Sequence, residues 1–459
     1  MTTSCLRNAR VPSMSSVLVR LRPHIAFAAL LALALMVRVP LLTQLGYTPD
    51  LNLHKAWGQA LFEDGLERVT EMPNSPVNYF PNYALPLYLF KGIYAFFTSV
   101  LHGSDPTGSI LLTVLLKLPA TFADLVCGLL LYLWSARWVS GKRRLIAPAL
   151  YLLNPGVIFD SAVWGQIDGL HATLVFAAFM LWFAGKKTGA WVVFVAALMT
   201  KVHSVVFLPL ILALALFDDG VRGFVRRRLP AIIAVFSIAV LPYLLALGPA
   251  RLLLGSAGSV SKYPFLTLNA FNIWWPFARI VGGLARDDQG PFPMVYVGFA
   301  VFAFAAILIL DSWRRDRSEK RTIIAAALIA FAFYMFPTEI HERYLFPFFP
   351  FAALVAAWDP RWRKIVPVLA IGFLVDLFFA SEAVIFPTAP IQLRDVMQVV
   401  DPWFLVNLIC FFALLAPYLE NRPRQIEIGS PSPAVGRDPA YLDFQVAERD
   451  TLPDASVRK

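Results

Sequence analysis

The sequence predicts an all-α protein, a polytopic transmembrane helical bundle of about twelve spans with a large first external loop that carries interfacial helices. Of its 459 residues, 58% are hydrophobic and only 15% are charged, a composition outside the usual range of soluble domains. Apolar runs of about 17 or more residues recur along the chain, which is the length that crosses the hydrocarbon core as a helix. Short basic clusters separate these runs, in the spacing typical of cytoplasmic loops. They lie at 142–144, 186–187, 226–228, 314–315 and 361–364.

The first expected element is a span at 24–41, preceded by a cytoplasmic N-terminal segment, 1–23. Four arginines stand before the apolar run, as in a secretory signal. The run is long for the apolar part of a signal, and many further spans follow. We therefore expect an uncleaved first helix.

The region 42–109 follows as one large external loop. Within it, 50–66 alternates apolar and charged residues with helical spacing, which is typical of an interfacial helix. The apolar segment 84–101 presents a conflict, because a full span there would place the basic stretch 137–144 outside the cell. We expect 84–101 to lie along the outer membrane surface or to re-enter the membrane.

The rest of the membrane domain, which ends at residue 420, continues the alternation of spans and loops. Further spans are expected near 110–136, 145–160, 168–184, 188–201, 203–217, 229–248, 292–311, 322–337, 343–358, 364–380 and 402–419. With the basic clusters inside, the outer connections are 161–168, 201–203, 249–291, 338–342 and 382–400. The segment 421–459 is rich in proline, serine and charge, and is expected to be a disordered cytoplasmic tail.

Charge and cysteine content exclude several function classes. The net charge of +10 is distributed as positive-inside clusters, so no nucleic-acid partner is indicated. Cys5, Cys127 and Cys410 are far apart, and none has metal-ligand spacing. Neither a disulfide framework nor a zinc site is predicted.

Asp50 is the first candidate for chemistry. It stands just past the first span, with His54 one helical turn on and Trp57 two turns on. Such a carboxylate can accept a proton from a substrate hydroxyl. The alternative is a purely structural role as the N-cap of the interfacial helix.

A second group lies in NPGVIFDSAVWGQIDGLH, residues 154–171. Asp160 and Asp168 flank Trp164 and Gln166 at an expected outer turn. Two carboxylates, an amide and an indole can hold a sugar by hydrogen bonds and stacking. A capped turn, with Asp168 as the N-cap of the next helix, is the competing interpretation.

Two further groups of candidate residues contain basic side chains and lie at the ends of expected spans. Lys201 lies between almost wholly apolar spans, where a lysine either extends to lipid headgroups or binds an anion such as phosphate. His341, Glu342 and Arg343 crowd a short turn in FPTEIHERYLFPFFP, residues 336–350. Ionisable groups beside apolar runs require partners. We therefore favour a role in ligand binding over the alternative, an exposed turn whose charges only neutralise one another.

The external loop 249–291 contains LNAFNIWWPF, residues 268–277. Asn272 combines there with a tryptophan pair. Sugars bind such surfaces, and so does the membrane interface, so an aromatic belt is the default interpretation.

Together these strings resemble the type C membrane glycosyltransferases, particularly the bacterial mannosyl- and glucosyltransferases that use polyprenyl-phosphate sugars. The resemblance covers about residues 24–360. It is carried by the external Asp50 with Trp57 seven residues later, the aromatic-proline stretch 77–88, the block 154–171, Thr200-Lys201, and HERYLFP at 341–347.

The resemblance implies that a mannose or glucose passes from a polyprenyl-phosphate donor to an acceptor hydroxyl of a glycan or lipid-linked acceptor, with inversion at the anomeric carbon. Asp50 would be the general base. Lys201, His341 and Arg343 would bind the donor phosphate. The residues expected to bind sugar or acceptor are His54, Trp57, Tyr79, Asp160, Trp164, Gln166, Asp168, Asn272 and Glu342.

The resemblance also implies a multi-pass protein of the plasma or inner membrane, surrounded by membrane lipid, with its active site on the non-cytoplasmic side. No cofactor is expected. No Asp-Asp or Asp-Glu pair near residue 50 suggests the divalent-metal variant of this chemistry, so no metal is expected either. The strings Tyr79-Phe80-Pro81-Asn82 and Lys201-Val202-His203 depart from the family pattern, and leave the donor sugar open.

Two other function classes fit many spans with intramembrane charges. A transporter or flippase of lipid-linked glycans would carry inverted repeats and broken helices near the midplane, whereas here the polar residues gather at one face and no repeat is visible. A polymerase or ligase shares the outer face and the lipid-linked substrates, and differs in moving a whole glycan.

Overall fold

The computed structural model describes residues 14–72, 75, 81–104, 106–259, 263–281, 286–288 and 293–420. Every named element in these ranges is a helix, and the only β-type pairings there are isolated bridges. The chain divides into two units, Met1–Leu419 and Glu420–Lys459. The expected disordered tail, 421–459, lies outside the described residues, and so does the chain before Met14.

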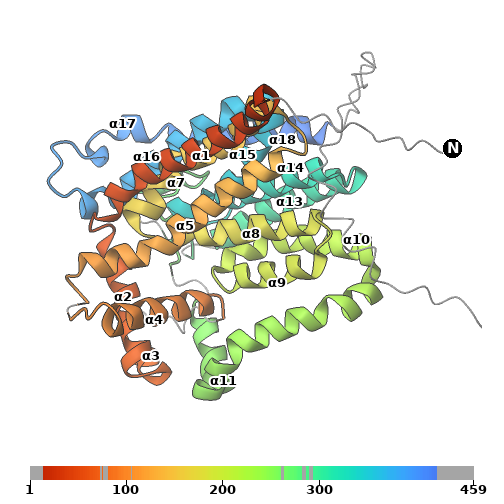
Figure 1. The fold of residues 1–459 in the computed structure, drawn as a ribbon. Helices are drawn as coiled ribbons and strands as arrows, with labels where there is room; N and C mark the ends of the chain where they lie inside the picture. The colour runs from red at the N-terminus through yellow and green to blue at the C-terminus, as the bar shows by residue number, and fades with distance from the viewer. Residues whose placement is uncertain are drawn as a thin grey trace, which may run out of the picture. The chain divides into compact units, whose positions relative to one another are not determined.

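Seven described helices are long and apolar enough to cross a membrane. These spans are Arg22–Leu42 in α1 (Met14–Leu42), Ile110–Ser135 (α5), Val202–Arg227, Leu229–Ala250 in α11 (Leu229–Ser259), Met294–Arg315 (α13), Pro360–Ile385 (α16) and Met397–Leu419. The third span joins η4 (Val202–Phe207) to α10 (Leu208–Arg227), and the last joins α17 (Met397–Val400) to α18 (Trp403–Leu419). The protein is therefore a multi-pass membrane protein by length and composition. Figure 1 shows α1, α5 and α8 running alongside one another.

The difference from about twelve expected spans has a structural reason. Four of the remaining apolar segments form helices too short to qualify: α8 (Asp168–Phe183), α9 (Lys187–Leu198), α14 (Glu319–Met335) and α15 (Phe348–Trp358). A hydropathy profile is averaged over a window of residues, so it does not show at which residue a helix ends. The fifth segment, 145–160, is bent rather than short.

That bent segment runs from η2 (Gly141–Leu145) and α6 (Ile146–Leu152) to α7 (Pro155–Ile158) and η3 (Phe159–Trp164), with an angle of 48° between its halves. Asn154 starts the second half, because its Oδ1 accepts the backbone N–H of Gly156 at 2.9 Å, and Pro155 follows at the first helical position. Trp164 at the end of the segment and Gln166 just beyond it are both buried.

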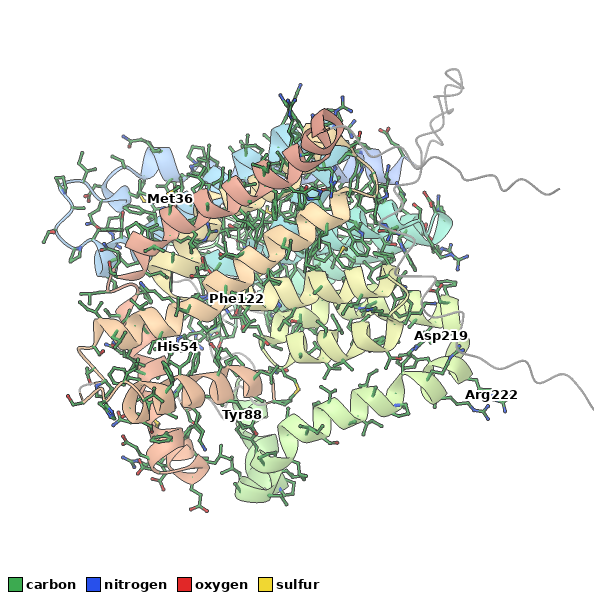
Figure 2. The ribbon with its side chains drawn as sticks, in the orientation of Figure 1. Met36, His54, Tyr88, Phe122, Asp219 and Arg222 are labelled. Carbon is green, nitrogen blue, oxygen red and sulfur yellow. The ribbon has the colours of Figure 1, made fainter. Side chains whose placement is uncertain are left out.

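Helices α14 and α15 form the centre of the core, where nearly every side chain is buried. They pack against each other, and α15 also packs against α5, α6 and α16. The outer faces are apolar instead: Met36 is 65% exposed and Phe122 is 67% exposed (Figure 2). An exposed apolar face on spans of this length is the surface that lipid covers.

The described residues between the first span and α5 form three helices, α2 (Thr48–Glu63), α3 (Leu66–Glu71) and α4 (Ala84–Ser99). Helices α2 and α4 pack closely, since a Cβ at Gly58 would stand 2.7 Å from the carbonyl oxygen of Phe90. The segment 84–101 is thus a helix supported by α2, and it is not among the seven long spans. The remaining described helices are α12 (Trp275–Val281), η5 (Glu342–Leu345) and η6 (Leu393–Asp395).

A buried ion pair joins the first span to the bundle. Arg38 of α1 and Asp124 of α5 are both inaccessible, with Nη2 and Oδ2 3.4 Å apart. Asp124 also accepts hydrogen bonds from the Tyr151 hydroxyl at 3.0 Å and the Ser161 hydroxyl at 2.7 Å. One carboxylate therefore connects α1, α5, α6 and η3.

Candidate functional site

Asp50 lies in the first turn of α2, but it is not the helix cap. The N-cap is Tyr47, which makes no side-chain capping bond, so the N-cap interpretation of Asp50 is wrong. Its Oδ2 instead accepts a hydrogen bond from the Trp164 indole N–H at 3.0 Å and another from the Gln166 amide. The carboxylate is partly exposed. Two donors fix one oxygen, and Asp50 stays within reach of a ligand.

Backbone contacts between Tyr47 and Trp164 hold Asp50 beside the bent segment. The N–H of Tyr47 donates to the carbonyl of Trp164 at 3.0 Å, and their rings lie 4.6 Å apart. Gly46 and Gly165 adopt left-handed backbone, with φ of 72° and 92°, on either side of Leu51. A Cβ at either glycine would stand less than 3 Å from the Leu51 side chain. Glycine is required at both positions for space as well as for conformation.

Asp168 and Lys201 form a bidentate buried ion pair. Asp168 is the first residue of α8, after the N-cap Ile167, and Lys201 lies in the turn between α9 and η4. The lysine Nζ is 2.8 Å and 2.7 Å from the two carboxylate oxygens. Both side chains are buried, so the interpretations of Asp168 as a simple cap and of Lys201 as a headgroup anchor are wrong.

Gln166 connects this ion pair to Asp50. Its amide nitrogen donates to Asp50, while its Oε1 lies 3.5 Å from the Nζ of Lys201. The polar chain therefore runs from Asp50 through Gln166 to Lys201 and Asp168. Two of its members come from one turn, and the others come from residues far away in sequence.

Arg343 approaches the same carboxylate from the other side. Its Nε is 3.9 Å from Asp168 Oδ2, its Nη1 donates to Glu342 at 2.6 Å, and its guanidinium stands 6.0 Å from the Trp164 ring. His341 Nδ1 lies 3.7 Å from Glu342. The HERYLFP string therefore meets the block 154–171 and Lys201 in one place.

The ionisation of this turn follows from its burial and its charges. Burial by itself would raise the pKa of Glu342, but Arg343 and the neighbouring His341 lower it to about 2. Burial would lower the pKa of Arg343, and the carboxylates of Glu342, Asp50 and Asp168 raise it well above the ordinary arginine value. Burial and Arg343 lower the pKa of His341. At neutral pH the turn holds an ion pair and a neutral imidazole.

The loop around Asn272 supports the HERYLFP turn from behind. Leu268 exchanges backbone hydrogen bonds with the turn, donating to Ile340 at 2.9 Å and accepting from Glu342 at 3.3 Å. The indole of Trp274 donates to the carbonyl of Phe336 at 2.7 Å. Asn272 is fully buried and bonds backbone groups only. Asn272 therefore shapes the site without facing it.

His54 and Trp57 lie in the same helix as Asp50, α2. The buried His54 ring lies 4.3 Å from Phe90, and its Nε2 is 3.4 Å from the Tyr83 hydroxyl. Burial lowers the pKa of His54 to about 4, with Lys201 and Arg343 acting in the same direction and Asp50 opposing. Trp57 packs beside His54 at 5.8 Å. Tyr79, expected to bind sugar, lies outside the described residues.

Asp160 does not join the hydrogen-bonded chain through its side chain. The residue is fully buried, and neither carboxylate oxygen has a hydrogen-bond partner in the described part of the chain. Its backbone carbonyl accepts the N–H groups of Gly165 and Gln166 at 3.0 Å and 3.1 Å. Asp160 therefore holds the turn that presents Gln166 through its backbone, and its carboxyl group makes no described hydrogen bond to the other candidates.

The sequence predicted no role for three contributors. Tyr47 stacks on Trp164, and its own sequence position gave no sign of this. His171 and His203 meet behind Asp168, with ring centroids 4.2 Å apart. His171 stands three residues after Asp168, the spacing of neighbours on one helix face, so that pair was accessible from the sequence. The approach of His203 depends on the fold.

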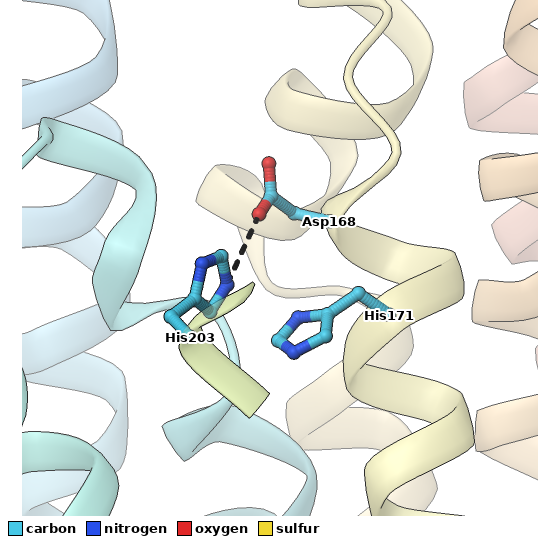
Figure 3. Close-up of side chains that lie close together, drawn as sticks. All are labelled: Asp168, His171 and His203. Atoms are coloured by element: carbon cyan, nitrogen blue, oxygen red, sulfur yellow. Dashed lines mark ion pairs between the residues drawn. The ribbon is translucent and has the colours of Figure 1, made fainter. Parts of the chain in front are cut away.

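One group of described residues has the composition of a metal site. Ligand atoms of Asp168, His171 and His203 all lie within 4.8 Å of one another, and all three side chains are buried. Figure 3 shows the two imidazoles on either side of the space below the Asp168 carboxylate. No protein-family model matches this chain, and no curated protein matches it.

Proposed function

We propose that this protein is a membrane glycosyltransferase that moves one hexose, mannose or glucose, from a polyprenyl-phosphate donor to an acceptor hydroxyl. One observation carries the proposal. A partly exposed carboxylate, Asp50, is joined through Gln166 to a site where Lys201 and Arg343 converge on Asp168. Base and anion-binding groups in one site are what displacement of a phosphate by an alcohol requires.

Asp50 acts as the base in this scheme. It takes the proton of the acceptor hydroxyl as that oxygen forms a bond to the anomeric carbon of the donor. The bond from that carbon to the phosphate oxygen breaks, and its electron pair leaves with the polyprenyl phosphate. Because attack and departure are on opposite faces, one step inverts the anomeric centre. Trp164 and Gln166 orient the carboxylate by their hydrogen bonds to one oxygen.

Lys201, Arg343 and His341 receive the departing phosphate. The two cations are held by Asp168 and Glu342, so a phosphate shares them with carboxylates that are already in place. Positive charge fixed before the reaction stabilises charge that develops in the transition state without reorganisation. His54, Trp57, Asp160 and the remaining candidates shape the pocket for sugar and acceptor.

The membrane arrangement belongs to the same proposal. The short helices α8, α9, α14 and α15, together with the bent segment, complete about twelve crossings of a plasma or inner membrane. The basic clusters stay in the cytoplasm, so Asp50, Lys201 and the HERYLFP turn face the other side. A lipid-linked or glycan acceptor then approaches from outside, next to the lipid-bound donor.

A transporter of lipid-linked glycans is the second candidate, because the 48° break beside the site is a feature that transporters use at substrate sites. The test offers synthetic polyprenyl-phosphate mannose and glucose to purified protein in vesicles with extracted membrane lipids as acceptors. Transfer of one hexose to an acceptor supports the proposal. Movement of the intact lipid-linked sugar between leaflets, without transfer, would replace it with the transporter.

A further inference from the structure

We propose that Asp168, His171 and His203 bind one divalent transition-metal ion of the Zn²⁺ class, behind the proposed phosphate site. Asp168 and His171 lie on one face of α8, and His203 reaches them from η4. The Nε2 of His203 is 3.9 Å from Oδ1 of Asp168 (Figure 3). Ligands of one tetrahedral ion stand roughly 3.3 Å apart. Only a small closure of the three side chains is needed.

The imidazole rings of His171 and His203 have nitrogen atoms that are available to bind a metal ion. Among the residues that the structure describes, neither ring nitrogen of His171 has a hydrogen-bond partner, and neither has Nε2 of His203. His171 is fully buried and His203 is 3% exposed. An unsatisfied buried polar group costs about 1–3 kcal/mol, and a neutral imidazole nitrogen is a metal ligand as it stands. Metal coordination would satisfy one nitrogen on each ring.

The surrounding charge permits a dication although Lys201 already touches Asp168. Each carboxylate oxygen has two lone pairs, and the lysine ammonium contacts each oxygen once. Asp50, Asp168 and Glu342 outnumber the permanent cations Lys201 and Arg343. A divalent ion therefore does not enter a site of net positive charge.

The ligand set selects the metal. Two imidazoles with one carboxylate suit Zn²⁺ and its neighbours, whereas Mg²⁺ and Ca²⁺ prefer oxygen ligands alone. The ion would join α8 to η4 and fix the carboxylate that orients Lys201. The proton transfer at Asp50 does not pass through the ion, but the ion would share Asp168 with Lys201 of the proposed phosphate site.

Metal content tests the inference directly. Full-length protein is purified in detergent through an affinity tag without histidine, dialysed against buffered Zn²⁺, and analysed by inductively coupled plasma mass spectrometry. We expect one ion per chain, and visible d–d bands of low-symmetry Co²⁺ after Co²⁺ loading. The double variant His171→Ala/His203→Ala is expected to bind at least about tenfold less tightly. The matched control is His54→Ala, which removes another buried histidine and should retain the metal.

The outcomes distinguish the absence of a metal site from misfolding of the variant and from failure of the transferase proposal. Wild-type protein that holds no stoichiometric metal, or a double variant that holds as much as wild type, would overturn the inference. If the double variant does not fold, the wild-type stoichiometry and the Co²⁺ spectrum still decide. Asp50→Asn separates the two proposals, because it should bind the ion normally whatever happens to transfer.

Discussion

At the scale of single residues, Asp168 is the carboxylate that both cations of the candidate site approach. Lys201 binds both of its oxygens, and Arg343 approaches one of them at 3.9 Å. All three side chains are largely withdrawn from solvent. A buried ion is stable only with its counter-ions, so removing one partner leaves a charge without compensation.

Replacing Lys201 by methionine is therefore expected to lower the free energy of unfolding by about 3–5 kcal/mol. The control is Lys187→Met, whose ion pair with Asp218 at 3.1 Å is partly exposed on both sides. That change should cost about 1 kcal/mol or less. Denaturant unfolding in detergent measures both. Equal losses for the two variants would show that burial of the Lys201 pair has no special weight.

His54 predicts a pH dependence of stability. Burial lowers its pKa to about 4 in the folded protein, while an unfolded histidine binds its proton below about pH 6.5. The unfolded state thus gains protons first, and stability falls as the pH drops from about 6.5 to about 4. The shift corresponds to about 3 kcal/mol at most.

In His54→Gln this part of the acid sensitivity should disappear. The thermal midpoint of wild type is expected to fall more steeply between pH 7 and pH 4.5 than that of the variant, with both measured in the same detergent and salt. Parallel pH profiles would mean that the pKa of His54 is not lowered in the folded state.

At the scale of elements, the bent segment 141–164 positions the residues that donate hydrogen bonds to Asp50. Its second half ends in Gly165, whose left-handed backbone directs Trp164 and Gln166 onto Asp50. The turn is closed by the Asp160 carbonyl, which accepts two backbone N–H groups. A straight helix through this region would carry Gln166 past Asp50.

Gly165→Ala should therefore damage the site more than the fold. A Cβ there would meet Leu51 at 2.8 Å and would also strain a backbone at φ 92°. The matched control is Gly185→Ala, where φ is 80° and nothing lies within 4 Å of the added carbon. Both variants should lose about 1–2 kcal/mol of stability from strain. Only Gly165→Ala should lose hexose transfer, and equal activity in the two would contradict this account.

The sequence predicted the members of the site better than their contacts. Asp50, the 154–171 block, Lys201 and the HERYLFP turn were each recognisable, because charges beside long apolar runs need partners. Their bonds to one another depend on four distant segments meeting, and no local pattern encodes this. Hydropathy located the seven long spans, but it could not show that Asn154 and Pro155 break another one.

At the scale of the whole molecule, the ion pair between Arg38 and Asp124 fixes the first span against the bundle. This pair was not predicted from the sequence, although charges inside long apolar runs require an explanation. Asp124 also bonds Ser161, which lies three residues before Trp164 in η3. The anchor of the first helix and the support of the site therefore share one carboxylate.

Arg38→Met is expected to destabilise the protein by about 3–5 kcal/mol, because Asp124 is left buried without its cation. The double variant Arg38→Met/Asp124→Leu removes both charges and should recover much of the loss, since apolar replacement of a buried pair is often neutral. Thermal unfolding of the single and double variants measures the coupling. Additive losses would show that the two side chains do not act as a pair.

The central claim is that Asp50 is the base of a hexosyl transfer. The most direct measurement is the single-turnover rate of transfer from the polyprenyl-phosphate hexose that wild type accepts, compared between Asp50→Asn and the control Asp64→Asn. Asp64 is an exposed aspartate at the other end of α2. We predict that Asp50→Asn, still folded and still binding donor, is slower by about 10²–10⁴-fold, and that Asp64→Asn matches wild type. Transfer at the wild-type rate by folded Asp50→Asn would contradict the claim.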